Sequence, residues 1–203
     1  MIKLHGIDVS GNTYKVSLLL SILKIEYEFS KIDVVKQHHK SVDFLKLNPR
    51  GEFPVLQDGE ITIWDSQAIL IYLSRQYGGH HLYPDRPAEM SHITQWLCVA
   101  NNEIHHSLAK ARAILKFSRP GNLKQCQLYA STVLNIINNH LSGREWIATE
   151  HFSLADIACY PYIALAEEGE ISLRGYRHIS HWIERMQNID NYIEMPGLPL
   201  VLA

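Results

Sequence analysis

The spacing of apolar residues predicts strands mixed with helices in the first part of the chain. Between residues 12 and 23 apolar side chains recur at helical intervals, whereas Tyr27 and Phe29 alternate with polar neighbours as in a half-buried strand. Asp58-Gly59 separates two short apolar runs, which is a hairpin signal. The predicted elements are a strand at 1–5, a helix from 12, a strand within 27–34, a helix at 41–47, strands at 54–57 and 60–63, and a helix at 66–77. This order predicts an α/β layer with a mixed sheet, whose first strand–helix–strand unit is a right-handed crossover.

Beyond a Gly- and Pro-rich break, the pattern is helical. One long amphipathic helix is predicted by apolar residues three or four positions apart: Ile93, Leu97, Ala100, Ile104, Leu108, Ala111 and Leu115. Similar spacing predicts helices over 123–141 and around 179–186. Ser153 and Asp156 form a variant capping box that opens a further helix, in which Pro161 predicts a kink or an early stop. We therefore predict three parts: an α/β domain at 1–78, a linker at 79–88 and an all-helical bundle at 89–203.

Composition narrows the class of protein. The 203 residues are 46% apolar and 20% charged, as in an ordinary globular protein, and the net charge of -2 gives no reason to expect nucleic acid as a partner. Cys98, Cys126 and Cys159 show no C-x-x-C spacing, which favours reduced thiols. No apolar stretch at the N-terminus resembles a signal peptide, and none elsewhere approaches the roughly 20 residues of a membrane span. We expect a soluble intracellular protein that does not interact with membranes.

Ser10-Gly11-Asn12 lies where the first predicted strand gives way to the first helix. Ser and Asn are favoured N-cap residues, and capping alone explains them. A helix N-terminus with a hydroxyl nearby also stabilises an anion. A thiolate suits such a place, because helix N-termini lower thiol pKa values. The two roles are compatible.

Phe53-Pro54-Val55 places a proline directly before a strand, and proline lacks the N–H group that a central strand position needs. An ordinary strand start is one interpretation. The other is a cis Phe53–Pro54 bond, which would turn the backbone N–H and C=O groups of Val55 outward, available to an extended peptide ligand.

Asp65-Ser66 begins the third predicted helix, where Ser66 is a candidate N-cap. The alternative is ligand binding, in which the helix N-terminus binds a carboxylate and Asp65 pairs with an amine beside it. A ligand that carries both an α-amine and an α-carboxylate would satisfy the two residues together.

The histidines offer one candidate cluster and no metal site. His38-His39-Lys40 is cationic and is either solvated surface or a recognition element for a second carboxylate. His105 and His106 are neighbours on a predicted helix, so their side chains point about 100° apart and do not share one metal ion. His80-His81 lies in the linker.

Together these segments resemble the cytosolic glutathione transferase family over nearly the whole chain. The turn Ser10-Gly11-Asn12 with Lys15-Val16 resembles the active-site turn of the serine-type classes. Further segments resemble the plant phi class and its bacterial relatives: His39-Lys40, Asp43-Phe44-Leu45 and Asn48-Pro49-Arg50-Gly51. Three more match the family's cis-proline, Glu/Asp-Ser and helix-capping motifs: Phe53-Pro54-Val55-Leu56, Trp64-Asp65-Ser66-Gln67-Ala68-Ile69 and Ser153-Leu154-Ala155-Asp156-Ile157.

The resemblance implies a thioredoxin-like domain that binds glutathione and activates its thiolate for attack on a small electrophile, without a metal. Ser10, or Asn12 in its place, would donate a hydrogen bond to the sulfur. In the Phe53-Pro54-Val55 segment, the backbone of Val55 would pair with the cysteinyl residue. Asp65 and Ser66 would bind the γ-glutamyl group, and His39 and Lys40 would bind the glycyl carboxylate. The resemblance also implies a cytoplasmic homodimer, in which Glu103 would reach across to the γ-glutamyl amine.

The second substrate is expected between the domains, against the long helix. Asn102, His106 and Lys110 share one flank of this helix, with Arg112 nearby. Asp65 departs from the common glutamate by one methylene, and the absence of a cysteine near residue 10 disfavours mixed-disulfide chemistry. Two alternatives remain open. One is a glutathione-dependent reductase of disulfides or peroxides; the other is a non-catalytic binding or regulatory protein with the same fold.

Overall fold

The computed structural model describes residues 1–198 and divides the chain into two compact units. The first consists of residues 1–79 together with Ile193–Pro196, and the second begins at His80. The predicted helical domain extends to residue 203, and its last five residues lie outside the described ones. Within residues 1–198, no helix is long and apolar enough to cross a membrane.

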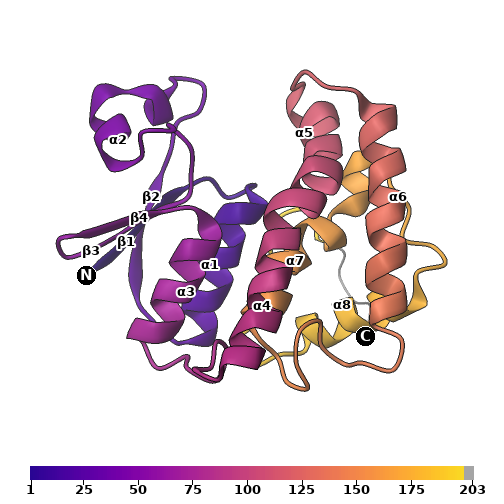
Figure 1. Cartoon of the computed structure of the whole chain (residues 1–203). Helices are drawn as coiled ribbons and strands as arrows, with labels where there is room; N and C mark the ends of the chain where they lie inside the picture. The colour runs from indigo at the N-terminus through magenta and orange to yellow at the C-terminus, as the bar shows by residue number, and fades with distance from the viewer. Residues whose placement is uncertain (199–203) are drawn as a thin grey trace. The chain divides into compact units, whose positions relative to one another are not determined.

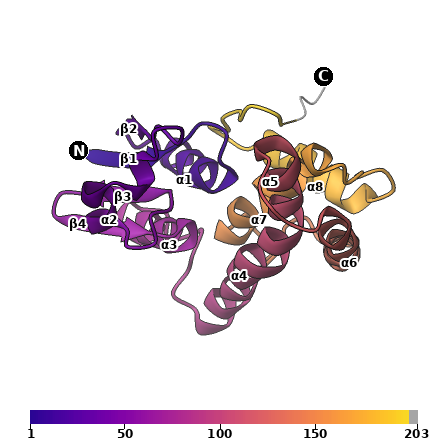
Figure 2. The same cartoon turned by 90° about the horizontal axis from the view of Figure 1, so that it is seen from above.

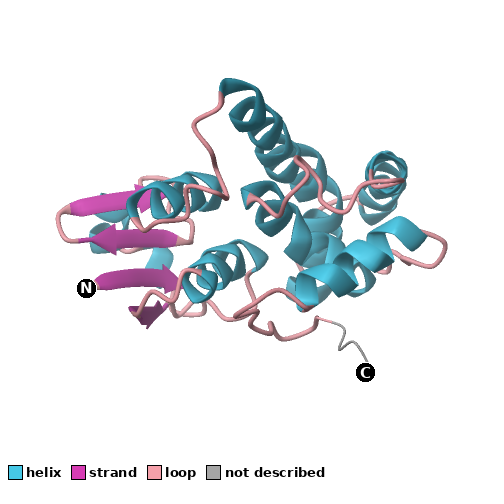
Figure 3. Ribbon diagram, turned by 90° about the horizontal axis from the view of Figure 1, so that it is seen from below, coloured by secondary structure: helices cyan, strands magenta, loops and turns pink. Residues whose placement is uncertain are grey.

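The first unit is built on a four-stranded sheet of order β2-β1-β3-β4 (Figures 1 and 3). β1 pairs in parallel with β2 and antiparallel with β3, which pairs antiparallel with β4. The elements are β1 (Ile2–Gly6), α1 (Gly11–Ile22), β2 (Tyr27–Lys31), the short 3₁₀ helix η1 (His38–Lys40), α2 (Val42–Leu47), β3 (Val55–Asp58), β4 (Ile61–Trp64) and α3 (Ser66–Gln76). The predicted α/β class with a mixed sheet is confirmed.

Packing of α1 and α3 side by side on one face of the sheet forms the core of this unit (Figures 1 and 2). β1 buries alternate residues, including Ile2 and Leu4, as expected for a strand with one covered face. α1 is buried over most of its circumference, because it lies between the sheet and neighbouring elements. Its N-terminus is thereby held at the carboxyl end of β1.

A segment from the far end of the sequence completes the first unit. Ile193–Pro196 belongs to this unit, and the hydroxyl of Tyr14 on α1 donates a hydrogen bond to the backbone carbonyl of Ile193, at 2.7 Å. Tyr14 is only 4% exposed and Met195 is buried. The segment therefore covers α1 within four residues of Ser10.

The first helices of the second unit form a continuous run from Pro87 to Phe117. It consists of α4 (Pro87–Val99), η2 (Ala100–Ala109) and α5 (Lys110–Phe117), and η2 is a ten-residue π-helical stretch. The predicted long amphipathic helix is therefore present, with a wider middle segment. Ala100, Ile104 and Leu108 are buried there and step by four residues, a spacing that suits a helix wider than the α form.

α7 (Leu154–Ala164), all of whose residues are buried, packs against α4 and η2, and the second unit contains further helices beside these. They are α6 (Leu123–His140), the short η3 (Ala166–Gly169) and α8 (Arg177–Gln187). α7 continues only three residues past Pro161, in agreement with the predicted early stop.

The capping box predicted at the start of α7 is confirmed. Asp156 accepts hydrogen bonds from the Ser153 backbone at 3.0 Å and the Ser153 hydroxyl at 3.1 Å, and also from the Ile147 backbone at 2.9 Å and the Trp182 indole at 3.0 Å. Burial raises the pKa of Asp156 to about 6, while these hydrogen bonds act in the opposite direction. This carboxyl group thus ties α7 to α8 and to the preceding loop.

Candidate functional site

The N-terminus of α1 carries the first group of predicted residues. Ser10 is the N-cap, and its Oγ accepts a hydrogen bond from the Thr13 backbone at 3.2 Å, so the capping interpretation is confirmed. The Oδ1 atom of Asn12 accepts a hydrogen bond from Nζ of Lys15 at 2.9 Å. Lys15 is only 1% exposed, which is unusual for a lysine. The positive end of the helix dipole and a buried ammonium group therefore lie close to Ser10 and Asn12.

The segment before β3 contains a cis peptide bond between Phe53 and Pro54. Val55 is fully buried and lies opposite His5 in β1 and Trp64 in β4. Phe53 is half-buried and precedes the strand. The interpretation of this segment as an ordinary strand start is therefore incomplete, because the chain turns sharply at Pro54 before it enters the sheet.

His39 and Lys40 lie next to this segment. The His39 ring packs edge-on against the Phe53 ring, with centroids 5.9 Å apart, and Nζ of Lys40 donates a hydrogen bond to the Arg50 carbonyl at 3.1 Å. Gly51 permits this approach, because it has a φ of +60° and an added Cβ would lie 2.7 Å from the His39 carbonyl oxygen. The cationic cluster and the Pro54 turn therefore form one local surface.

The start of α3 differs from the sequence-based prediction in one respect. The N-cap is Asp65, not Ser66: Oδ1 of Asp65 accepts hydrogen bonds from the backbones of Gln67 at 2.9 Å and Ala68 at 3.5 Å, while Ser66 is the first helical residue. Asp65 reaches this position with a φ of +76°, a conformation that is strained for a residue other than glycine. Strain of this kind is often found at ligand-binding positions.

A donor that the sequence analysis did not single out lies beside Ser66. The Ser66 hydroxyl donates a hydrogen bond to Oε1 of Gln67, and both residues are nearly buried, at 2% and 5% exposure. Nε2 of Gln67 is buried and has no hydrogen-bond partner among residues 1–198. An unsatisfied buried donor of this kind is unfavourable unless a ligand accepts its hydrogen bond. It lies at the positive end of the α3 dipole, where an anion is favoured.

Both parts of the chain match known protein families. Residues 2–75 match the family model of the glutathione S-transferase N-terminal domain, and residues 108–190 match that of the C-terminal domain. Glutathione S-transferase GstB of Escherichia coli K12 is 31% identical over 170 residues, which cover 80% of this chain and 82% of that protein. The chain belongs to the glutathione S-transferase family.

Two further proteins of known name or structure are similar to this chain. Disulfide-bond oxidoreductase YfcG of Escherichia coli K12 is 26% identical over 192 residues, covering 87% of this chain and 86% of that protein. The crystal structure of a glutathione S-transferase from Pseudomonas fluorescens is 29% identical, with a TM-score of 0.90 and coverage of 96% and 98% of the two chains. The family and its fold are thus confirmed, while assignment to a serine-type class stays a prediction.

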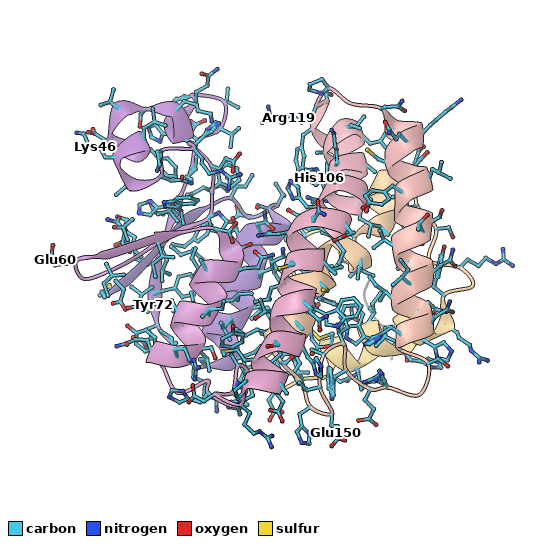
Figure 4. All side chains as sticks on the ribbon, in the orientation of Figure 1. Lys46, Glu60, Tyr72, His106, Arg119 and Glu150 are labelled. Atoms are coloured by element: carbon cyan, nitrogen blue, oxygen red, sulfur yellow. The ribbon has the colours of Figure 1, made fainter. Side chains whose placement is uncertain are left out.

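The residues of this family member that were predicted to meet a second substrate lie in the second unit. Asn102, His106 and Lys110 are exposed (His106 is labelled in Figure 4). His106 and Lys110 line a surface groove of about 600 Å³ between the η2–α5 run and α6, and Asn102 is not among its lining residues. Among residues 1–198, no group of three His, Cys, Asp or Glu side chains is arranged to hold a metal ion.

Arg112, which the sequence analysis placed near these residues, is instead an internal structural group. It is 3% exposed, forms an ion pair with Glu168, and stacks over the Phe117 ring at 5.3 Å. Burial acts to raise the pKa of Glu168, but hydrogen bonds and charge from Lys116 and Arg112 outweigh it and hold that pKa below its ordinary value. Arg112 therefore links α5 to η3 and is not exposed on the predicted flank.

Proposed function

We propose that this protein is a glutathione transferase that stabilises the thiolate of bound glutathione for nucleophilic attack on a small electrophile. The observation that carries the proposal is the start of α3. There a strained acidic N-cap, Asp65, adjoins a helix N-terminus with an unsatisfied buried donor on Gln67. A γ-glutamyl group carries an amine for Asp65 and a carboxylate for the helix N-terminus, Ser66 and Gln67.

The rest of the tripeptide has matching groups in the same unit. Its glycyl carboxylate is proposed to face His39 and Lys40, which the ring contact with Phe53 places beside the Pro54 turn. The cysteinyl backbone was predicted to pair with Val55. Val55 already has partners in both neighbouring strands, so we assign this contact to the backbone of Phe53, which lies outside the strand.

Ser10 is proposed as a hydrogen-bond donor to the sulfur. Its Oγ accepts the Thr13 N–H, and the hydroxyl proton is not used by that bond, so capping and catalysis are compatible. Lowering a thiol pKa from about 8.5 by about two units requires about 2.7 kcal/mol of thiolate stabilisation. A charge-assisted hydrogen bond contributes about 1.5–3 kcal/mol and a helix N-terminus about 0.3–1 kcal/mol. Together these contributions amount to about 1.8–4 kcal/mol, a range that includes the required value.

A second candidate function is favoured by the likeness to YfcG, which is named as a disulfide-bond oxidoreductase. The same site would then use glutathione to reduce a disulfide. The two activities are separated by offering the protein a panel of electrophiles and, in parallel, a low-molecular-weight disulfide, and by comparing kcat/KM for each.

The direct test is an ultraviolet titration of the glutathione thiolate on the protein as a function of pH, with the protein's own thiols subtracted in a parallel titration without glutathione. We expect saturable binding and a thiol pKa about two units below that of free glutathione. Ser10→Ala should retain binding and lose at least one unit of this shift. Ser17→Ala, on the same helix, is the matched control. Binding with an unshifted pKa would favour a carrier or reductase, and no binding would refute both enzymatic functions.

A further inference from the structure

Lys15 is a buried charged group to which the proposed mechanism assigns no role. It lies in α1, three residues after Asn12 and therefore on the same face of the helix. Burying an ammonium group is costly, and such groups are retained where a specific partner holds them. One partner of Lys15 is the side-chain oxygen of Asn12, at 2.9 Å.

The contact with Lys15 fixes the orientation of the Asn12 side-chain amide. An asparagine side chain has one acceptor atom and one donor group, which exchange places when the amide is turned over. An ammonium group only donates hydrogen bonds, so its contact requires Oδ1 of Asn12 to face Lys15. The Nδ2 group of Asn12 then points away from Oδ1 within the amide plane, where it is available as a donor.

We propose that Lys15 is a positioning residue, which holds the Asn12 amide so that its nitrogen, and not its oxygen, faces the sulfur of bound glutathione. This inference rests on the proposed function. With the opposite orientation, the amide oxygen would face the thiolate and repel it. Ser10 and Asn12 then act as two donors to one sulfur, and Lys15 acts on the thiolate through Asn12.

The first experiment tests the Lys15–Asn12 contact in the free protein, without glutathione. The side-chain amide resonances of Asn12, assigned by their loss in Asn12→Ala, should shift in Lys15→Met and return towards their original positions in Lys15→Arg, which restores a donor-only cation. Lys46→Met is the matched control, because Lys46 is an exposed lysine on α2 of the same unit (Figure 4), 70% exposed in its side chain. Unchanged Asn12 resonances in Lys15→Met would overturn the inference whatever the protein's function.

The second experiment measures the thiol pKa of bound glutathione in the same variants. Lys15→Met should raise it by about one unit, which reduces the thiolate about tenfold below that pKa. The kcat for conjugation should fall at acidic pH and recover at alkaline pH, where the thiolate forms unaided. Below about pH 6.5, where glutathione binds largely as the thiol, the glutathione Kd should change less than about twofold, because the carboxylates and the amine are proposed to bind at other residues. At alkaline pH the Kd should rise by up to about tenfold, since one unit of pKa corresponds to a tenfold difference in affinity for the thiolate. Lys15→Arg should restore most of the shift.

A double-mutant cycle decides whether Lys15 acts through Asn12. In the Asn12→Ala background, Lys15→Met should produce no further change in the bound thiol pKa. An equal change in both backgrounds would show that Lys15 acts independently, and would overturn the inference. Lys15→Met leaves the Asn12 oxygen without this donor, so urea unfolding of each variant checks that the fold is intact. If the wild-type protein itself does not shift the thiol pKa, the proposed function fails while the contact test still stands.

Discussion

Asp65 combines a structural and a proposed binding role, and the two are separable by substitution. Its Oδ1 caps α3 through the Gln67 backbone at 2.9 Å, and its φ is +76°. For a residue other than glycine, this conformation costs about 1–3 kcal/mol, whereas the cap contributes about 1 kcal/mol. Asn is an equally good cap and has the same shape as Asp, so the backbone strain is the same in both and Asp65→Asn should change the free energy of unfolding by less than about 0.5 kcal/mol.

The same substitution removes the negative charge that is proposed to pair with the γ-glutamyl amine. Loss of a charge-assisted hydrogen bond of about 1.5 kcal/mol weakens glutathione binding about tenfold. Asp65→Gly should relieve the backbone strain at a capping cost of only a few tenths of a kcal/mol. The glycine variant is therefore expected to be more stable than the wild type by about 1 kcal/mol, and to bind glutathione as weakly as Asp65→Asn.

Urea unfolding measures the stability, and isothermal titration calorimetry measures the affinity. A glutathione analogue without the α-amine is the matched ligand, because its affinity should be the same for the wild type and for Asp65→Asn. If the analogue loses as much affinity as glutathione does, Asp65 does not contact the amine. If Asp65→Gly is less stable than the wild type, the strain argument is wrong.

Three further predictions concern the helix caps and a tyrosine pair. Ser10→Gly removes the hydroxyl but costs only a few tenths of a kcal/mol as a cap, so it should reduce kcat/KM about tenfold or more while stability, measured by urea unfolding, changes little. If Ser10→Gly lost as much stability as Ser10→Ala, as well as the same activity, this reasoning would be contradicted. Each carboxylate oxygen of Asp156 accepts two buried hydrogen bonds. Asp156→Asn replaces one of these oxygens by an NH₂ group, which cannot accept them, and should lower the free energy of unfolding by about 3 kcal/mol. Burial and a hydrogen bond to Asp58 raise the pKa of Tyr72 to about 12, and a hydrogen bond to Asp58 and burial raise the pKa of Tyr77 to about 12. The contribution of the two tyrosines to stability is therefore complete below pH 10 and is lost as the pH rises through 12. A double substitution of these tyrosines by phenylalanine should flatten the alkaline limb of a thermal-melting profile, and an unchanged limb would refute the assignment.

The local sequence pattern predicted most helices and strands of this protein, because apolar spacing and turn residues determine secondary structure over short stretches of the chain. The strand predicted at 60–63 is shifted by one residue, to Ile61–Trp64, and the capping box at Ser153 is present as expected. The π-helical η2 was not predicted, since steps of four residues also fit an α-helix. The N-cap was placed on Ser66 because Asp and Ser are both good caps, and the positive φ of Asp65 has no signature in the composition.

Errors at the site arose where burial depends on distant partners. Arg112 was placed near the candidate flank of the long helix and its burial was not predicted, because its ion pair with Glu168 joins residues 56 positions apart, which no local pattern reveals. Lys15 was quoted only as part of a motif, since a lysine is ordinarily exposed. The apolar run Val16 to Leu20, interrupted only by Ser17, was the available signal that this part of α1 is surrounded by core. Gln67 was overlooked for the same reason, because its burial follows from the packing of α3.

The hydrogen bond between Tyr14 and Ile193 makes the first unit discontinuous in sequence. A nascent chain that has reached residue 79 holds every strand of the sheet and the helices α1 and α3, and still lacks the segment whose backbone accepts a hydrogen bond from Tyr14. The hydrogen bond to Ile193 contributes about 0.5–1.5 kcal/mol, an appreciable fraction of the stability of a domain of this size. The helix that carries Ser10 and Asn12 therefore reaches its final stability only after residue 193 has been synthesised, so that the proposed glutathione site is completed by a segment that is translated 179 positions after Tyr14.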